Sequence, residues 1–153
     1  MKIGTLCYID DGTKTLMMHR VKKKNDMHEG KWNGLGGKLI SGESPEDCVI
    51  REVFEESGLT IIEPIFRGII TFPKFDGFED WIVFVYTANN FTGELIECDE
   101  GILEWINNNK LMSLNLWEGD KIYMKWIHDE KFFSAKFIYK NRILQDYFVT
   151  FNS

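Results

Sequence analysis

Short runs of β-branched and aromatic residues, separated by turn sequences, recur along the chain and predict a protein rich in strands. The first two runs, 3–9 and 15–20, flank Asp10-Asp11-Gly12, and this turn chemistry favours an opening hairpin. Later runs of the same kind predict strands at 61–72, 81–87, 103–106, 132–139 and 143–151. The last two flank the turn 140–142 and are expected to form a closing hairpin.

Residues 45–57 carry the strongest helix signals. Ser44 and Asp47 make a start of the capping-box type, Pro45 stands at the first helical position, and Gly58 follows where a left-handed residue ends many helices. At about 100° per residue, one side of this helix is predicted to be apolar and the opposite side acidic. The apolar side comprises Val49, Ile50, Val53 and Phe54, and the acidic side comprises Glu52, Glu55 and Glu56.

A shorter second helix is expected at 119–128. The order strands, helix, strands, helix, strands predicts an α/β fold, a mixed sandwich of sheet and helices. No Gly/Ser-rich linker or internal repeat interrupts the chain, and its three prolines are scattered. A single domain over residues 1–153 is therefore expected.

Composition changes this picture mainly through charge. Hydrophobic residues make up 44% and charged residues 27% of the 153, a balance typical of a soluble globular domain, and the longest apolar stretches are too short to cross a bilayer. The net charge of -6 argues against general affinity for duplex nucleic acid or a membrane surface. A polyanion must be held locally, and residues 20–38 carry six basic side chains against two acidic ones. Arg20, at the end of a strand, is the best candidate for a phosphate contact.

The cysteines and histidines suggest no separate chemistry. Three cysteines without a CxxC spacing or a signal peptide argue against a disulfide framework or a zinc site and favour a reducing, cytoplasmic location. The histidines share no spacing suited to a metal or to a nucleophile and its base, so no role is assigned to His19, His28 or His128.

The acidic side of the first helix needs an explanation. Like charges three and four residues apart destabilise a helix by about 0.2–0.5 kcal/mol per pair. One interpretation is a solvated acidic face relieved by Arg51 and nearby lysines. The other is a divalent-cation site, because clustered hard oxygen ligands suit Mg²⁺ or Mn²⁺. The spacing of the three glutamates alone leaves both open.

The residues around this helix favour the cation site. The order Gly37, five residues, Glu43, seven residues, then 51–59 as Arg-Glu-Val-Phe-Glu-Glu-Ser-Gly-Leu resembles the signature of the Nudix hydrolases at every specified position. The resemblance implies a Nudix α/β/α sandwich with a mixed β-sheet, in which a loop-helix-loop binds divalent metal and cleaves a diphosphate linked to another moiety. Metal ions serve such chemistry because they neutralise phosphate charge and activate water.

The resemblance also implies roles for single residues. Arg51 would orient the carboxylates by ion pairing, while Glu56 is the first choice for general base and Glu52 the second. The implied cofactor is Mg²⁺, with Mn²⁺ possible. Its ligands would come from the backbone of Gly36 or Gly37 and from the side chains of Glu52, Glu55, Glu56 and Glu100.

Outside the motif, segments 30–38, 99–100 and 116–120 resemble the MutT-type oxidised-purine nucleoside triphosphatases, especially the eukaryotic ones. In those enzymes the residue matching Asn33 hydrogen-bonds the purine, the one matching Trp117 stacks on it, and the acid matching Asp120 reads the base edge. Gly119 stands where the eukaryotic relatives carry a second acid, which argues against a broad range of oxidised bases. The substrate contacts implied are Thr5, Arg20, Asn33, Leu35, Gly36, Gly37, Lys38, Trp117 and Asp120.

The expected activity is therefore hydrolysis of a small-molecule nucleotide, 8-oxo-dGTP, to monophosphate and pyrophosphate in nucleotide-pool sanitation. The expected oligomeric state is a monomer or a homodimer. One alternative is another nucleoside diphosphate derivative, such as ADP-ribose, a dinucleotide or an RNA 5′ end. A second alternative is a nucleotide sensor without catalysis, against which the intact acid cluster argues.

Overall fold

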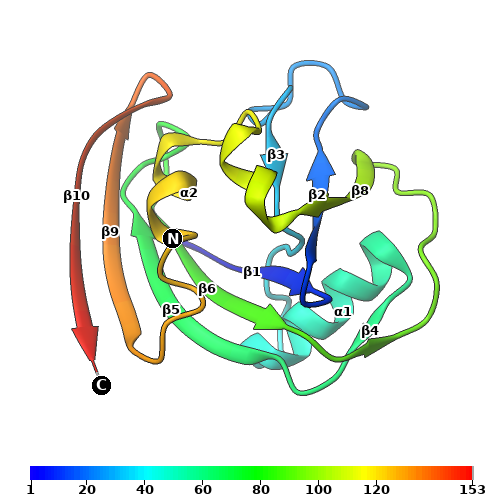
Figure 1. The fold of residues 1–153 in the computed structure, drawn as a ribbon. Coiled ribbons are helices and arrows are strands. Elements are labelled where there is room, and N and C mark those ends of the chain that lie inside the picture. Colours follow the sequence, from blue (N-terminus) through cyan, green and yellow to red (C-terminus); the bar gives the residue numbers. More distant parts are fainter. Residues whose placement is uncertain (153) are drawn as a thin grey trace.

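The computed structural model describes residues 1–152 as one curved sheet with helices on both sides (Figure 1). The helices are α1 (Pro45–Ser57) and α2 (Glu118–Tyr123), and η1 (Asn108–Ser113) is a 3₁₀ helix. The strands are β1 (Lys2–Asp10), β2 (Lys14–His19), β3 (Trp32–Asn33), β4 (Thr60–Ile61), β5 (Ile65–Phe72), β6 (Trp81–Ala88), β7 (Phe91–Thr92), β8 (Ile102–Asn107), β9 (Phe132–Lys140) and β10 (Ile143–Asn152).

Eight of these strands form one mixed sheet. The order is β10-β9-β5-β6-β1-β2-β3, and β8 pairs with the edge of β2 opposite β3. The pairs β1/β6 and β5/β9 are parallel, and the other pairs are antiparallel. The opening and closing hairpins of the sequence prediction are confirmed as β1–β2 and β9–β10. β4 and β7 form a small separate sheet.

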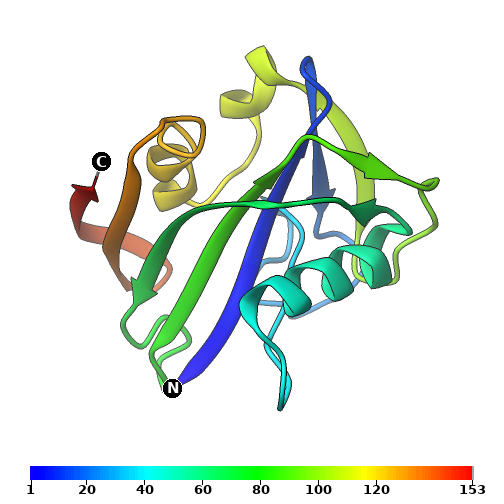
Figure 2. The same cartoon turned by 90° about the horizontal axis from the view of Figure 1, so that it is seen from below.

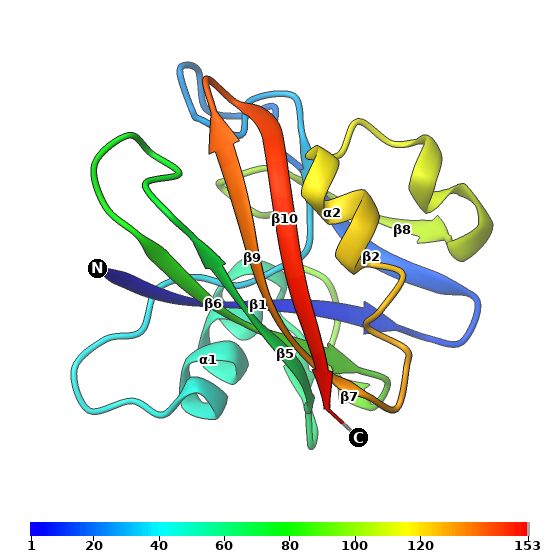
Figure 3. The ribbon, with the colours of Figure 1, turned by 90° about the vertical axis from the view of Figure 1, so that its left-hand side faces the viewer.

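The sheet separates two hydrophobic clusters. Along β1, Cys7 and Ile9 belong to the cluster beneath α1, whereas Tyr8 belongs to the cluster that includes α2. This alternation is expected of a strand covered on both faces. Figure 2 shows α1 lying against one face, and Figure 3 shows α2 on the other side beside the β9–β10 hairpin. The mixed α/β sandwich predicted from the sequence is therefore confirmed, and β1 passes between the two halves of the core.

Helix α1 begins and ends where its sequence predicts. The Ser44 hydroxyl accepts a hydrogen bond from the Asp47 N–H, the Asp47 carboxylate accepts one from the Ser44 N–H, and Gly58 ends the helix in the left-handed region at φ 81°. The predicted faces need correction, because Phe54 is 55% exposed and Glu56 only 7% exposed. Glu56 follows Val49 by seven residues, which is about two helical turns, so it shares the buried side.

Two predictions of element boundaries were wrong. The strand predicted at 61–72 is broken into β4 and β5, because Glu63 adopts a left-handed conformation and Pro64 cannot donate to a ladder. The helix predicted at 119–128 ends at Tyr123. Beyond it the backbone N–H groups of Lys125 and Trp126 bond to carbonyls three residues back, as in a tighter turn.

No helix among residues 1–152 is long and apolar enough to cross a bilayer.

Candidate functional site

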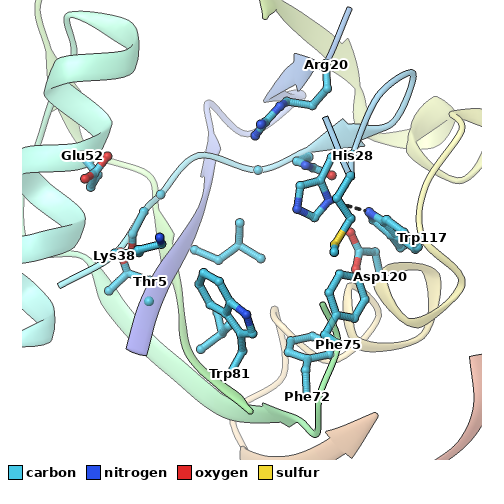
Figure 4. Close-up of a pocket in the computed structure, with 18 of the residues that line it drawn as sticks. Thr5, Arg20, His28, Lys38, Glu52, Phe72, Phe75, Trp81, Trp117 and Asp120 are labelled. Carbon is cyan, nitrogen blue, oxygen red and sulfur yellow. Dashed lines mark hydrogen bonds between the residues drawn. The ribbon is translucent and has the colours of Figure 1, made fainter. Parts of the chain in front are cut away.

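A cavity of about 670 Å³ lies on the sheet between the α1 side and the α2 side of the molecule. That volume is within the usual range of small-molecule sites. In Figure 4, Glu52, Thr5 and Lys38 lie toward one end, and His28, Trp117 and Asp120 lie toward the other. The site thus has an acidic end with a lysine beside it and an aromatic end with polar groups.

The acidic end depends on the segment 34–38 passing very close to β1 and α1. The Thr5 N–H donates to the Gly37 carbonyl at 2.8 Å, and Cys7 and Leu35 exchange backbone hydrogen bonds at 2.6 and 3.0 Å. A side chain at Gly36 would overlap the Thr5 carbonyl, and one at Gly37 would collide with the Glu52 carboxylate. Glycine is therefore required at Gly36, where the clash is with backbone, and at Gly37 it leaves the Glu52 carboxylate its place beside the loop.

Arg51 holds three carboxylates in place. It binds both oxygens of Glu43, at 2.6 and 2.9 Å, and the same guanidinium donates to Glu52 at 2.7 Å and to Glu55 at 3.2 Å. It also donates to the Lys38 carbonyl at 3.1 Å. These contacts agree with the orienting role expected of Arg51. They add Glu43 as the residue that fixes the guanidinium, because two parallel bonds define its plane.

Glu56 lies deeper than its neighbours. Its carboxyl accepts the Gly36 N–H at 2.9 Å, and the Glu100 carboxyl faces it. Burial raises the pKa of Glu56 to about 9, with further contributions from the contact with Glu100 and from the charge of Glu52. In the protein without a cation this carboxyl therefore carries a proton at pH 7.

The acidic end fits a divalent cation in its chemistry. Its side-chain donors are hard carboxylate oxygens, and the crowding that raises the pKa of Glu56 is the kind that a nearby positive charge relieves. Within residues 1–152, no three Asp, Glu, His or Cys side chains are already gathered closely enough to hold a metal ion. Two of the candidates, Glu52 and Glu55, are bound to Arg51, and Glu56 is bound to the loop. Each of these bonds occupies one oxygen of its carboxylate, which leaves the second oxygen for a cation.

The aromatic end is built around Trp117, which is 5% exposed and lines the cavity. Its indole N–H donates to Nδ1 of His28 at 2.9 Å, and the Lys31 ammonium lies 5.0 Å from its ring centroid. Phe75 packs against it at 5.1 Å between ring centroids. Nearby, Oδ1 of Asn33 is buried without a hydrogen-bond partner among the described residues. A buried orphan acceptor costs free energy, and a ligand N–H would satisfy it.

Asp120 is buried at the same end. The Tyr123 hydroxyl hydrogen-bonds its carboxyl and contacts the Tyr8 hydroxyl at 2.9 Å. Burial raises the pKa of Asp120 to about 7, although the bond from Tyr123 and the charge of Lys31 oppose this rise. Asp120 can therefore either donate or accept a hydrogen bond near neutral pH.

The raised pKa of Asp120 predicts a pH-dependent cost in stability. An acid with a higher pKa in the folded protein than in the unfolded chain destabilises the fold as pH rises, here from about pH 4 to about pH 7, with the full cost above pH 7. Asp120→Asn should remove this cost, which is at most of the order of 4 kcal/mol. Thermal unfolding at pH 5 and pH 8 should show a larger gain at pH 8, while exposed Asp129→Asn shows no such trend. An equal gain at both pH values would contradict the burial of this charge.

Gly119 has a structural reason to lack a side chain. Its N–H donates to the Tyr139 hydroxyl at 2.7 Å, and an added Cβ would lie 2.7 Å from that oxygen. Tyr139 lines the cavity. The phenol therefore occupies the space that an acidic side chain at position 119 would need.

The basic residues of the segment 20–38 are divided between the site and the surface. Arg20 lines the cavity but is paired with Asp26, at 2.8 and 2.9 Å. Lys38 makes no salt bridge among the described residues, and its ammonium lies 5.5 Å from the Trp81 ring centroid. Lys22 binds Glu97 and the Cys98 carbonyl outside the cavity. Lys38 is thus the most available cation for a phosphate.

Most of the residues expected from the sequence meet in this cavity. Those that line it are Thr5, Arg20, Asn33, Gly36, Gly37, Lys38, Glu52, Glu56, Glu100, Trp117 and Asp120. Arg51 and Glu55 lie outside the lining, and Leu35 is fully buried in the core beneath α1. A direct contact between the Leu35 side chain and substrate is therefore not supported, although its backbone shapes the loop.

Several residues that line the cavity were not predicted from the sequence. They include Met27, His28, Phe72, Phe75, Trp81, Tyr123 and Tyr139. Most are aromatic and read as ordinary core or strand residues in the chain. For Phe72, Trp81 and Tyr139, alternation along β5, β6 and β9 could have indicated which side of the sheet they face; the others lie in loops or in α2 and gave no such signal.

Comparison with known proteins identifies the class. The NUDIX domain family model matches residues 2–127, and the chain belongs to this family. It is 36% identical over 120 residues to the uncharacterized Nudix hydrolase YvcI of Bacillus subtilis (76% of this chain, 72% of the relative). It is 35% identical over 115 residues to the oxidized purine nucleoside triphosphate hydrolase of Danio rerio (75% and 74%).

A solved structure extends the likeness to nearly the whole chain. The MutT protein from Bacillus halodurans superposes with a TM-score of 0.86 at 29% identity and covers 97% of each chain. The protein is therefore a Nudix hydrolase of MutT-like fold. Nudix hydrolases generally use divalent metal ions, in keeping with the carboxylates of the acidic end.

Proposed function

We propose that this Nudix hydrolase cleaves oxidised purine nucleoside triphosphates, 8-oxo-dGTP above all, to the monophosphate and pyrophosphate. One observation carries the proposal: a single cavity joins the carboxylates of the Nudix helix to an aromatic end where Asn33 offers an unpaired acceptor and Asp120 a titratable acid. A purine presents N–H donors and carbonyl acceptors that match such groups. The relative from Danio rerio, named as an oxidized purine nucleoside triphosphate hydrolase, supports the same choice.

In the proposed complex, the base lies among Asn33, Trp117 and Asp120, and the triphosphate extends toward α1. Lys38 binds phosphate oxygens, and Arg20 can do so if it leaves Asp26. This placement puts the diphosphate beside Glu52 and Glu56. The two ends of the cavity thus separate recognition of the base from hydrolysis.

Glu52, Glu55, Glu56 and Glu100, with a backbone carbonyl of Gly36 or Gly37, would hold Mg²⁺ or Mn²⁺. When bound, such a cation would supply positive charge against the diphosphate and would lower the pKa of the attacking water. Glu56, in its ionised form, accepts the proton of that water, and the Gly36 N–H keeps its carboxylate in position. Arg51 orients Glu52 and Glu55 without touching the substrate.

The reaction products test the register of the triphosphate, that is, which phosphorus lies at the carboxylates. With 8-oxo-dGTP and Mg²⁺, the first products should be the monophosphate and pyrophosphate, because the base end fixes which phosphorus reaches the carboxylates. Phosphorus NMR of the reaction, with no pyrophosphatase present, distinguishes pyrophosphate from orthophosphate. Orthophosphate as the first product would contradict the proposed register.

A further inference from the structure

We propose that His28 is a specificity-determining residue that donates a hydrogen bond from Nε2 to a ring carbonyl of the bound purine. The inference rests on the proposed function, since it places the base at the aromatic end of the cavity. His28 comes from the segment between β2 and β3 and lines this end. Its role follows from the partner of its other ring nitrogen.

The tautomer of His28 is fixed by Trp117. An indole N–H can only donate, so the Nδ1 atom that receives it at 2.9 Å must be unprotonated. A neutral imidazole then carries its proton on Nε2. Ring contacts add to this bond, because Phe75 stacks on the imidazole with ring centroids 6.1 Å apart and the Trp117 ring meets it edge-on at 5.6 Å.

No atom of residues 1–152 accepts a hydrogen bond from the Nε2–H. Among the hydrogen bonds of residues 1–152, the His28 side chain makes only the one with Trp117. In Figure 4 the edge of the ring opposite Trp117 faces the middle of the cavity. A fixed donor therefore points at the space where the base would lie.

Burial keeps His28 neutral, and nearby charges modify its effect. Burial and the positive charges of Arg20 and Arg142 together lower the pKa of His28 to about 4, against the opposing charge of Asp26. The donor thus persists throughout the physiological pH range. Together with the orphan acceptor of Asn33, it gives the site one fixed donor and one fixed acceptor. A keto purine offers both complements, an oxygen and a ring N–H.

The structural premise can be tested without any substitution. Long-range ¹H–¹⁵N NMR of the imidazoles should show His28 as the Nε2–H tautomer between pH 5.5 and pH 8. A protonated Nδ1 in this range, either as the other tautomer or as imidazolium, would overturn the proposal.

Two substitutions separate donation to the base from support of Trp117. In His28→Asn, the side-chain oxygen can still accept the Trp117 N–H, but the Nε2 donor is lost. In His28→Gln, the amide N–H₂ can reach the Nε2 position, but the Nδ1 acceptor is lost. We expect His28→Asn to lower kcat/KM for 8-oxo-dGTP by roughly 5- to 100-fold, mainly through KM, and His28→Gln to retain most of the activity.

The same assay separates the possible outcomes. A purely structural role for His28 predicts the reverse order, in which His28→Gln loses more activity than His28→Asn. That order, an equal loss of activity in both variants, or no loss in either would overturn the proposal. The proposed function would still stand in each case. Turnover of dGTP and 8-oxo-dATP by His28→Asn tells whether the acceptor is the oxygen on C6 or on C8, and a loss with either one supports the proposal. His128→Asn, at an exposed histidine, should match the unmodified protein. An unmodified protein that is inactive on all three nucleotides would overturn both the proposed function and this inference.

Discussion

Glu56→Gln should lower kcat by about 10²- to 10⁴-fold at saturating Mg²⁺, the usual contribution of a general base. The substitution keeps the shape of the side chain and an oxygen to accept the Gly36 N–H. It removes the group that takes the proton from water. Because the raised pKa already keeps Glu56 neutral in the cation-free protein at pH 7, glutamine should hardly change the melting temperature. Initial rates and thermal unfolding of the same samples measure both effects.

Glu104→Gln supplies the matched control, because Glu104 is exposed on β8 and does not line the cavity. Its turnover should equal that of the unmodified protein. If Glu56→Gln and Glu52→Gln both kept near-normal turnover at saturating Mg²⁺, the catalytic role of the α1 carboxylates would be wrong. A nucleotide-sensing role would then gain support.

Asp120→Asn should reduce the preference for 8-oxo-dGTP over dGTP by roughly 10- to 100-fold, the range expected for a hydrogen bond to a charged group. The oxidised base differs by a carbonyl on C8 and a proton on N7, so only hydrogen bonds can separate it strongly from guanine. An amide cannot ionise, so it loses the response of Asp120 to pH near 7. The ratio of kcat/KM values for the two nucleotides, measured at pH 6 and pH 8, should therefore depend on pH only in the unmodified protein.

Trp117→Ala is the contrasting variant, because stacking acts on the π face that both purines share. It should weaken the binding of both nucleotides alike and leave the ratio of their kcat/KM values unchanged. Since Trp117 is part of the core, Trp117→Phe should be measured beside it to separate loss of stacking from loss of folding. A change of ratio in the Trp117 variants, with none in Asp120→Asn, would contradict the assigned roles.

Local signals made α1 and its motif predictable from the sequence. Ser44, Pro45 and Gly58 act within a few residues of the helix they delimit, and their geometry matches the prediction. The break before β5 was also signalled locally, by Pro64, but the apolar residues on both sides of Glu63 and Pro64 concealed it. The wrong assignment of Glu56 to the solvent-facing side of α1 has a similar origin. Its position two turns after Val49 indicated the buried side, but it was grouped with the other acidic residues.

The aromatic end of the cavity was much less predictable. His28 acquires its proposed role from Trp117, 89 residues away, and Tyr123 meets Tyr8 across 115 residues. Such contacts depend on the sheet topology, which places β1 beside β6 and the segment before α2 against the segment before β3. A histidine without a local partner gives no sequence signal for a tautomer or a ligand.

The most direct test of the central claim is a comparison of kcat/KM for the unmodified protein with Mg²⁺ on 8-oxo-dGTP, dGTP, ADP-ribose and a dinucleotide. We predict that 8-oxo-dGTP is the preferred substrate, by more than the roughly 10- to 200-fold that apolar contacts alone provide, because its N7–H and carbonyl meet fixed polar groups. Equal efficiency on 8-oxo-dGTP and dGTP, or a preference for ADP-ribose or the dinucleotide, would contradict the proposed function.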